Sequence, residues 1–345
     1  MSHVDRIDEL FTLKTIAETL NQCVDLDEMM PSVLEKLLHL TGLKTGWIFL
    51  VKERPHYSCV ADHGLPPALE WENKKPMRHM SCWCLDKFWS GQLQQAVNIM
   101  ECKRLEDAVT YQWGDTHNLT HHATVPLIAS GKRFGLLNVG SPGKEHFTEK
   151  ELTLLQSVAF QIGTAVERII LFEAQKQRAE YFARLDELTR VIWKINNKRV
   201  LPEKVVHHIA HYFQWPVIAL FLIKNRQLSL KSLYYKQEAG VRTKISHTLS
   251  LANAHIIKSA LKQQNVTLGQ EKLSFLPGVR DKNTWHTAGV PLILSDKPIG
   301  LLYLAKTLAN PFSEAERDVL KALGDHLSLL IETIRMPAYR SPCGK

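Results

Sequence analysis

Residues 121–158 read HHATVPLIASGKRFGLLNVGSPGKEHFTEKELTLLQSV, and residues 286–323 read HTAGVPLILSDKPIGLLYLAKTLANPFSEAERDVLKAL. The two stretches align without a gap at an offset of 165 residues, so that Gly135-Leu136-Leu137 pairs with Gly300-Leu301-Leu302. Upstream, Trp47-Ile48-Phe49-Leu50 corresponds to Ala219-Leu220-Phe221-Leu222 at an offset of 172. Two copies of about 150–170 residues each indicate a tandem pair of domains, because solenoids use many short repeats.

Each copy predicts the same order of elements. Two amphipathic helices come first, around residues 5–22 and 27–41 and again around 185–196 and 202–213. An apolar β segment, a polar middle with a short helix, and two strands joined by a tight turn follow. The last helix begins at Thr148 or Ser313, whose hydroxyl can cap it while the acids that follow favour its positive end. Strands in a hairpin with helices segregated to one side predict an α+β fold.

The composition is that of an ordinary globular protein, since 45% of the 345 residues are hydrophobic and 23% are charged. The N-terminus lacks a signal-like apolar region, and the uncharged stretches are shorter than the about 18–20 residues of a membrane span. These observations predict a cytoplasmic protein without a membrane partner. The net charge of +8 is dispersed, and without basic blocks it does not favour nucleic acid as a partner.

The closing segments, hVPLh…G…hGLLxh…F[ST]xxExxhL at residues 124–155 and 289–320, resemble the GAF domain, a small-molecule-sensing module. The resemblance implies two GAF-like domains, each an antiparallel sheet with helices on one face and a ligand pocket on the other. We place the first at residues 1–170, a connecting helix at 171–184, the second at 185–335 and a tail at 336–345. Residues 165–200 lack Pro and Gly, so one long helix is expected to join the domains.

The joining helix also carries a pattern typical of coiled coils. Leu185, Leu188, Ile192 and Ile195 are spaced three or four residues apart, and the final helix repeats this spacing from Leu320. Such a seam predicts a homodimer, which is the usual arrangement of sensors with GAF domains. The alternative is that each stripe packs against its own sheet, because surface helices of globular domains have nearly the same pattern.

Cysteines distinguish the first copy from the second. Cys82, Cys84 and Cys102 lie within 21 residues, whereas the chain between Cys102 and Cys343 contains no cysteine. The duplicated fold therefore does not need these thiols, and clustered cysteines inside the cell more often serve metal or redox chemistry than disulfides. If Ser81 caps a helix, Cys82 and Cys84 fall in its first turn, where the positive end favours the thiolate. The alternative is that they are ordinary buried thiols.

The arrangement Cys82-x-Cys84, Val97-Asn98-Ile99, Cys102 and Arg104-Leu105 resembles a motif of some bacterial sensor-kinase GAF domains, in which cysteines can hold a [2Fe–2S] cluster. The resemblance implies an iron–sulfur or zinc site formed by Cys82, Cys84 and Cys102. Such sites usually have four ligands. The fourth is expected to be Cys59, or alternatively His121 or His122.

The predicted function is non-catalytic sensing. Phosphate-binding loops, dinucleotide fingerprints, zinc-protease motifs and nucleophile elbows are all missing from the sequence. The first domain is expected to bind a small ligand, of unknown identity, or a redox-active metal centre, and to signal to a histidine kinase or another partner. Two alternatives remain: a thiol-based reductase of the type that reduces free methionine sulfoxide, and a purely structural dimerisation module.

Overall fold

The computed structural model describes residues 3–52, 54–79, 82–225, 227–236, 241–243, 254–279 and 281–335. The predicted tail at 336–345, with Cys343, and the predicted helix cap Ser81 lie outside the described residues. The chain divides into two compact units, Met1–Glu173 and Ala174–Lys345, which we call the first and second domains.

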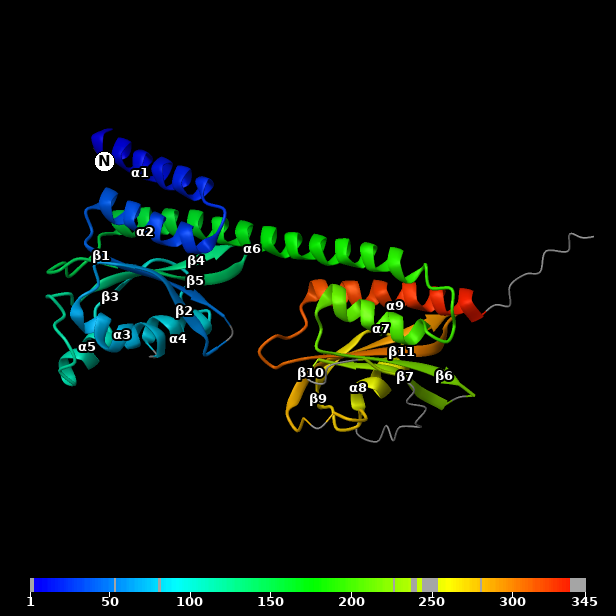
Figure 1. The fold of residues 1–345 in the computed structure, drawn as a ribbon. Helices are drawn as coiled ribbons and strands as arrows, with labels where there is room; N and C mark the ends of the chain where they lie inside the picture. Colours follow the sequence, from blue (N-terminus) through cyan, green and yellow to red (C-terminus); the bar gives the residue numbers. More distant parts are fainter. Residues whose placement is uncertain are drawn as a thin grey trace, which may run out of the picture. The chain divides into compact units, whose positions relative to one another are not determined.

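The first domain is a five-stranded antiparallel sheet of order β2-β1-β5-β4-β3 with helices on both faces (Figure 1). Helices α2 and α6 cover the back face, and the shorter helices α3, α4 and α5 cover the front face. The elements are α1 (His3–Gln22), α2 (Leu26–Thr41), β1 (Thr45–Val51), β2 (Tyr57–His63), α3 (Pro67–His79), α4 (Trp83–Trp89), β3 (Val97–Ile99), α5 (Lys103–Thr110), β4 (His122–Ala129), β5 (Lys132–Gly140) and α6 (Glu149–Ile192).

The second domain repeats this plan with a six-stranded antiparallel sheet of order β8-β7-β6-β11-β10-β9. Helices α7 and α9 lie on its back face and α8 on its front face (Figure 1). The elements are α7 (Leu201–Phe213), β6 (Val217–Lys224), β7 (Gln227–Tyr235), β8 (Val241–Thr243), α8 (His255–Gln263), β9 (Thr267–Lys272), β10 (Thr284–Leu294), β11 (Lys297–Lys306) and α9 (Glu314–Arg335). The predicted α+β fold of two antiparallel sheets is confirmed, but helices cover both faces of each sheet and not one face as expected, because the short helices of the polar middle pack on the front.

Strand alternation separates two cores in each domain. In the first domain, Ile48, Val125 and Leu137 point to the back face and pack under α2 and α6, while Trp47 and Leu136 point to the front. This follows from the two-residue period of a strand, which sends neighbouring side chains to opposite faces. The front core is the one that contains the cysteines.

The predicted joining helix is confirmed, because α6 runs without interruption for 44 residues from the first domain into the second. One window of α6 has the length and mean hydropathy, 1.3, that a membrane span requires, and 44% of that window is buried. The core helix of a soluble domain passes the same test, and α6 contributes Leu155, Val158 and Ile162 to the back core of the first domain.

The stripe that predicted a coiled-coil seam has a different role. Leu185, Leu188 and Ile192 are 3%, 0% and 0% exposed and belong to the back core of the second domain. They pack with residues of α7, α9 and the sheet, so they are not available to a second subunit. The assignment of these residues to an intersubunit seam was therefore wrong, and the alternative, packing on their own sheet, is the arrangement found.

Two equivalent glycines provide a test of the repeat. Gly135 and Gly300 sit beside a bulge in the closing hairpin, and a Cβ there would overlap the carbonyl oxygens of Phe49 and Phe221, respectively. We expect Gly135→Ala and Gly300→Ala each to destabilise its own domain by about 1–3 kcal/mol, because a packed sheet cannot move aside freely. Hydrogen exchange during denaturant titration measures each domain separately. The exposed Lys132→Ala is the control, and an unchanged first domain in Gly135→Ala would contradict the expectation.

Candidate functional site

The cysteines of the first domain occupy the starts of two short helices. Cys82 is the N-cap of α4 in an extended conformation, with φ −147° and ψ 161°. Cys102 is the N-cap of α5, with φ −96° and ψ 108°. The prediction that Ser81 would cap the helix is thus replaced by Cys82 in that role, while Cys84 lies in the first turn. Two residues that are two positions apart inside a helix point to nearly opposite sides. An extended N-cap residue is free of this constraint, and its side chain can turn toward the first turn of the helix.

Cys82, Cys84 and Cys102, which we call the thiol cluster, are 3%, 5% and 5% exposed in the front core. All three are free thiols. The thiols of Cys82 and Cys84 interact, and the interaction favours the thiolate at Cys82 over that at Cys84. The structure therefore brings together the two residues of the C-x-C motif and buries them.

A buried arginine adjoins the thiol cluster. Arg104 is 2% exposed, its Nε donates to the carbonyl oxygen of Pro76 at 2.8 Å, and its guanidinium lies 5.0 Å from the ring centroid of Phe49. Its Nη2 also donates to the Tyr57 hydroxyl at 3.4 Å. A buried charge needs polar or charged partners to offset its desolvation, and the sulfur of Cys82 is one of them.

The surroundings of the cysteines give their thiols different pKa values. Interaction with the Cys84 thiol and the charge of Arg104 outweigh burial and lower the pKa of Cys82. The pKa of Cys84 is raised by its interaction with Cys82 and by burial, and burial raises the pKa of Cys102. Burial and the nearby Asp62 carboxylate raise the pKa of Cys59 to about 12. The site thus favours one thiolate, at Cys82, among neutral thiols.

A polar network on the sheet lies next to the thiol cluster. The Thr124 hydroxyl donates to Asn138 Oδ1 at 2.8 Å, and it lies 3.4 Å from Cys84 Sγ. His122 Nε2 lies 3.9 Å from the same sulfur. Burial and the charge of Arg104 lower the pKa of His122 to about 3, so its imidazole is neutral. A neutral imidazole can act as a metal ligand or a hydrogen-bond partner of a thiol.

Within the described part of the chain, two buried nitrogens of this region have no hydrogen-bond partner, Trp47 Nε1 and His122 Nδ1. Their rings lie side by side, with centroids 5.1 Å apart. Buried polar groups are normally satisfied.

The other predicted ligands lie further out. Cys59 is partly buried on β2, and its thiol donates to the carbonyl oxygen of Ala61 at 3.5 Å. His121 precedes β4, and its Nδ1 lies 2.6 Å from the Thr120 hydroxyl. Across the described ranges, no group of three or more His, Cys, Asp or Glu side chains is arranged to hold a metal ion. The iron–sulfur or zinc site with Cys59, His121 or His122 stays a prediction.

Sequence reasoning missed the roles of Arg104, Thr124 and Asn138. A signal was present for each. Arg104 precedes Ala108 by four residues and so shares the buried face of α5. Thr124 and Asn138 alternate with the apolar residues of β4 and β5, which places them on the front face.

The second domain has a different group at the same place. Tyr303 corresponds to Asn138 at the offset of 165, and its hydroxyl donates to Glu271 at 2.7 Å. Both side chains are buried, 0% and 9% exposed. Phe275 also packs edge-on against the Tyr303 ring, so an aromatic pair and a carboxylate stand in the described front core of the second domain where the first domain has the amide of Asn138.

Comparison with known proteins identifies the fold. A family model described as GAF domain matches residues 23–167, and a second model with the same description matches residues 201–331. Both domains of this chain belong to the GAF family. The tandem arrangement expected from the repeat is therefore confirmed.

Three individual proteins are similar to this chain in sequence or in fold. The chain is 53% identical over 174 residues to the sensor histidine kinase YhcY of Bacillus subtilis, an alignment that covers 50% of this chain and 46% of that protein. It thus spans about half the length of this relative. The crystal structure of bacteriophytochrome RpBphP3 from R. palustris is similar in fold, with a TM-score of 0.55 and 10% identity, covering 94% of this chain and 74% of that one. A GAF domain from Coxiella burnetii phosphoenolpyruvate-protein phosphotransferase gives a TM-score of 0.40 and 16% identity, covering 49% and 98%.

Proposed function

We propose that this chain is the sensory region of a cytoplasmic signalling system of the histidine-kinase type. The observation that carries the proposal is the 53% identity to a sensor histidine kinase over half of the chain. Tandem GAF domains support a role in signal sensing. The kinase that receives the signal, on the same or another chain, is part of the proposal, and the GAF domains themselves are proposed to be non-catalytic.

The thiol cluster is proposed as the sensing group of the first domain. The support is the asymmetry between the copies: one domain buries three thiols beside a guanidinium, and the other fills the same face with Tyr303 and Phe275. The sensed quantity is a redox state or a bound metal, with Cys82, Cys84 and Cys102 as its ligands. Among the candidates for the remaining ligand, His122 lies nearest to the sulfur of Cys84.

If a [2Fe–2S] cluster binds, it supplies redox activity. If zinc binds, it cross-links its ligands in a fixed geometry. The chain's own residues would then orient the site. Arg104 offsets the negative charge of thiolates, and the thiol cluster ties the starts of α4 and α5 to the sheet. A change in the sulfurs would alter the packing of both helices on the front core.

A homodimer is also proposed, with a different surface from the one predicted. Apolar side chains are exposed on α1 and α6 of the first domain: Ile7, Leu10, Phe11, Phe160, Leu171 and Phe172. Exposed apolar side chains on neighbouring helices are typical of interaction surfaces, so these replace the buried stripe of the second domain as the proposed contact between subunits.

The sensing proposal predicts metal or redox reactivity that depends on three cysteines. In protein purified without oxygen, we expect stoichiometric iron with acid-labile sulfide, or zinc, and Ser at Cys82, Cys84 or Cys102 should abolish it, because each thiolate is a ligand. Cys23→Ser is the matched control, since Cys23 is buried on the back face. Absence of metal, together with Cys82, Cys84 and Cys102 thiols that react at the rate of Cys23 before and after oxidant, would refute the proposal.

A further inference from the structure

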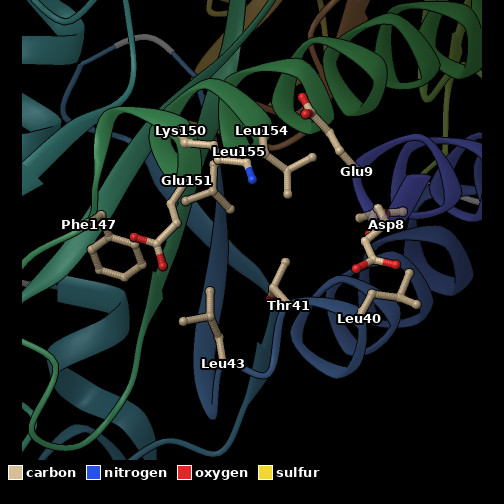
Figure 2. Close-up of a pocket in the computed structure, with 11 residues that line it drawn as sticks. Asp8, Glu9, Leu40, Thr41, Leu43, Phe147, Lys150, Glu151, Leu154 and Leu155 are labelled. Carbon is tan, nitrogen blue, oxygen red and sulfur yellow. Dashed lines mark hydrogen bonds between the residues drawn. The ribbon is translucent and has the colours of Figure 1, made fainter. Parts of the chain in front are cut away.

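A cavity lies on the back of the first domain, away from the thiol cluster. It has a volume of about 280 Å³ and is enclosed by α1, the end of α2 and the start of α6 (Figure 2). Its inner wall is apolar and includes Leu43, Phe147 and Leu155, and its rim carries the carboxylates of Glu9 and Glu151. Sites for drug-sized molecules have volumes of about 300–1,000 Å³. The cavity is slightly smaller, and its size suits a ligand with one bicyclic ring system.

The internal repeat gives each residue of this cavity a counterpart in the second domain. At the offset of 172, which also pairs the helix C-caps Gly42 and Gln214, Glu9 corresponds to Tyr181. The same offset matches Thr41 and Leu43 with Phe213 and Trp215, and the offset of 165 matches Phe147 and Glu151 with Phe312 and Glu316. The two domains can therefore be compared position by position.

In the second domain, aromatic rings occupy this place. Tyr181 stacks on Phe213 with centroids 6.4 Å apart, Phe213 stacks on Trp215 at 4.4 Å, and Trp215 meets Phe312 at 6.3 Å. The second domain keeps a groove of about 320 Å³ at the outer part of this place, lined by Glu180, Tyr181, Arg184 and Glu316, the counterparts of Asp8, Glu9, Thr12 and Glu151. Neither Phe213 nor Trp215 lines that groove, so only the inner part, which Thr41 and Leu43 leave open in the first domain, is filled by side chains in the second.

In the second domain, the carboxylate of Glu316 accepts a hydrogen bond from one of these rings. Glu316 Oε1 accepts a hydrogen bond from Trp215 Nε1 at 3.1 Å and another from Lys306 at 2.9 Å. In the first domain, Glu151 Oε1 accepts a hydrogen bond from Lys144 Nζ at 2.9 Å. Leu43 stands in place of Trp215, and its side chain has no N–H to donate. Hydrogen bonds from Lys144 and Thr148 outweigh burial and lower the pKa of Glu151, so the carboxylate is ionised and can accept a further donor.

We propose that this cavity binds a small aromatic amine, a molecule with a planar ring that carries an N–H and a protonated amino group. The ring takes the place of the rings of Phe213 and Trp215, and its N–H donates to Glu151. Three carboxylates, Asp8, Glu9 and Glu151, line the cavity with one lysine, Lys150, and Lys144 pairs with Glu151. The carboxylates thus outnumber the lysines by three to two, which favours the cationic amine over an anionic group. The site is separate from the thiol cluster and independent of the sensing proposal.

The probe is tryptamine, titrated into the full chain by calorimetry and ligand-observed NMR. We expect saturable binding with a Kd below about 1 mM, a range accessible to ligands of about a dozen non-hydrogen atoms. Indole-3-propionate has the same ring with the opposite charge and should bind at least tenfold more weakly. The titration extends to 5 mM, about five times that limit. Lack of saturable tryptamine binding in this range would overturn the proposal, and so would equal binding of both probes.

Variants locate the site. The triple change Glu9→Tyr, Thr41→Phe and Leu43→Trp copies the second domain and should reduce tryptamine affinity at least tenfold while the first domain stays folded. Glu151→Gln keeps the helix cap, because Gln also serves in a capping box, and should weaken binding at least fivefold. Val109→Trp, at an exposed position on α5 of the same domain, is the control. If the triple variant does not fold, Glu151→Gln decides, and wild-type affinity in that variant refutes the assignment.

Discussion

Replacement of Leu188 by Glu should unfold the second domain, and it should do so whether or not the protein is a dimer. Leu188 is 0% exposed among Leu185, Ile192 and the helices of the back core. Loss of a buried leucine side chain costs about 2–5 kcal/mol, and the carboxylate adds the free energy of burying an unpaired charge. Together these approach the whole stability of a domain, about 5–15 kcal/mol.

The measurement is hydrogen exchange with mass spectrometry, which reports each domain separately. Peptides of the second domain should lose protection in Leu188→Glu, and peptides of the first domain should keep it. Leu329→Glu is the matched control, since it is the same substitution in the same domain at a side chain of α9 that is 52% exposed and lies outside the proposed contact between subunits. If Leu188→Glu instead kept both domains protected and converted dimers to monomers in light scattering, the packing described for this stripe would be incorrect.

A second large effect is expected at the buried ion pair of the second domain. Lys306 Nζ lies 2.9 Å and 3.0 Å from the two carboxylate oxygens of Glu316, and the side chains are 6% and 2% exposed. Glu316→Gln leaves the lysine charge buried without a counter-charge, which costs about 3–5 kcal/mol. The corresponding change in the first domain, Glu151→Gln, should cost about 1 kcal/mol or less, because Glu151 and Lys144 are partly exposed, 41% and 27%.

The same pair makes stability depend on pH. Burial alone would raise the pKa of Glu316, but hydrogen bonds from Lys306, Ser313 and Trp215 outweigh it and lower the pKa below its ordinary value of 4.5. A carboxylate with a depressed pKa stabilises the folded state fully above its unfolded pKa, and this contribution is lost as the pH falls through the folded value. Unfolding in denaturant at pH 7 and then below 4.5 should show wild type losing stability to acid more steeply than Glu316→Gln. Parallel losses in the two proteins would contradict this role.

The sequence alone predicted the order of elements in both domains, because the hairpins at Gly135 and Gly300 recur together with the helix that follows each of them. It did not distinguish a coiled-coil seam from a core stripe at Leu188, since both require apolar residues at three- and four-residue intervals. The cysteines were found by their asymmetry, but their mutual arrangement depends on Cys82 being an extended N-cap. The role of Arg104 requires the tertiary structure, since no local pattern specifies Phe49 and Pro76 as its neighbours.

The cavity beside Glu151 was also beyond prediction from one copy. Leu43 and Thr41 are unremarkable residues by themselves, and only the alignment with Trp215 and Phe213 shows that ring volume is missing. Duplicated domains offer an internal reference of this kind, because the same backbone plan holds two different sets of side chains.

One continuous helix serves two separate cores, and this determines how its amides should exchange with deuterium. The turns of α6 around Val158 and Ile162 are held by the first domain, and those around Leu188 by the second. From residue 170 to residue 184 the side chains are exposed, except for the half-buried Tyr181. The middle amides can therefore open by local fraying of a few hydrogen bonds, whereas those at either end need a whole domain to open. Protection along this helix should fall from one end to the middle and rise again toward the other.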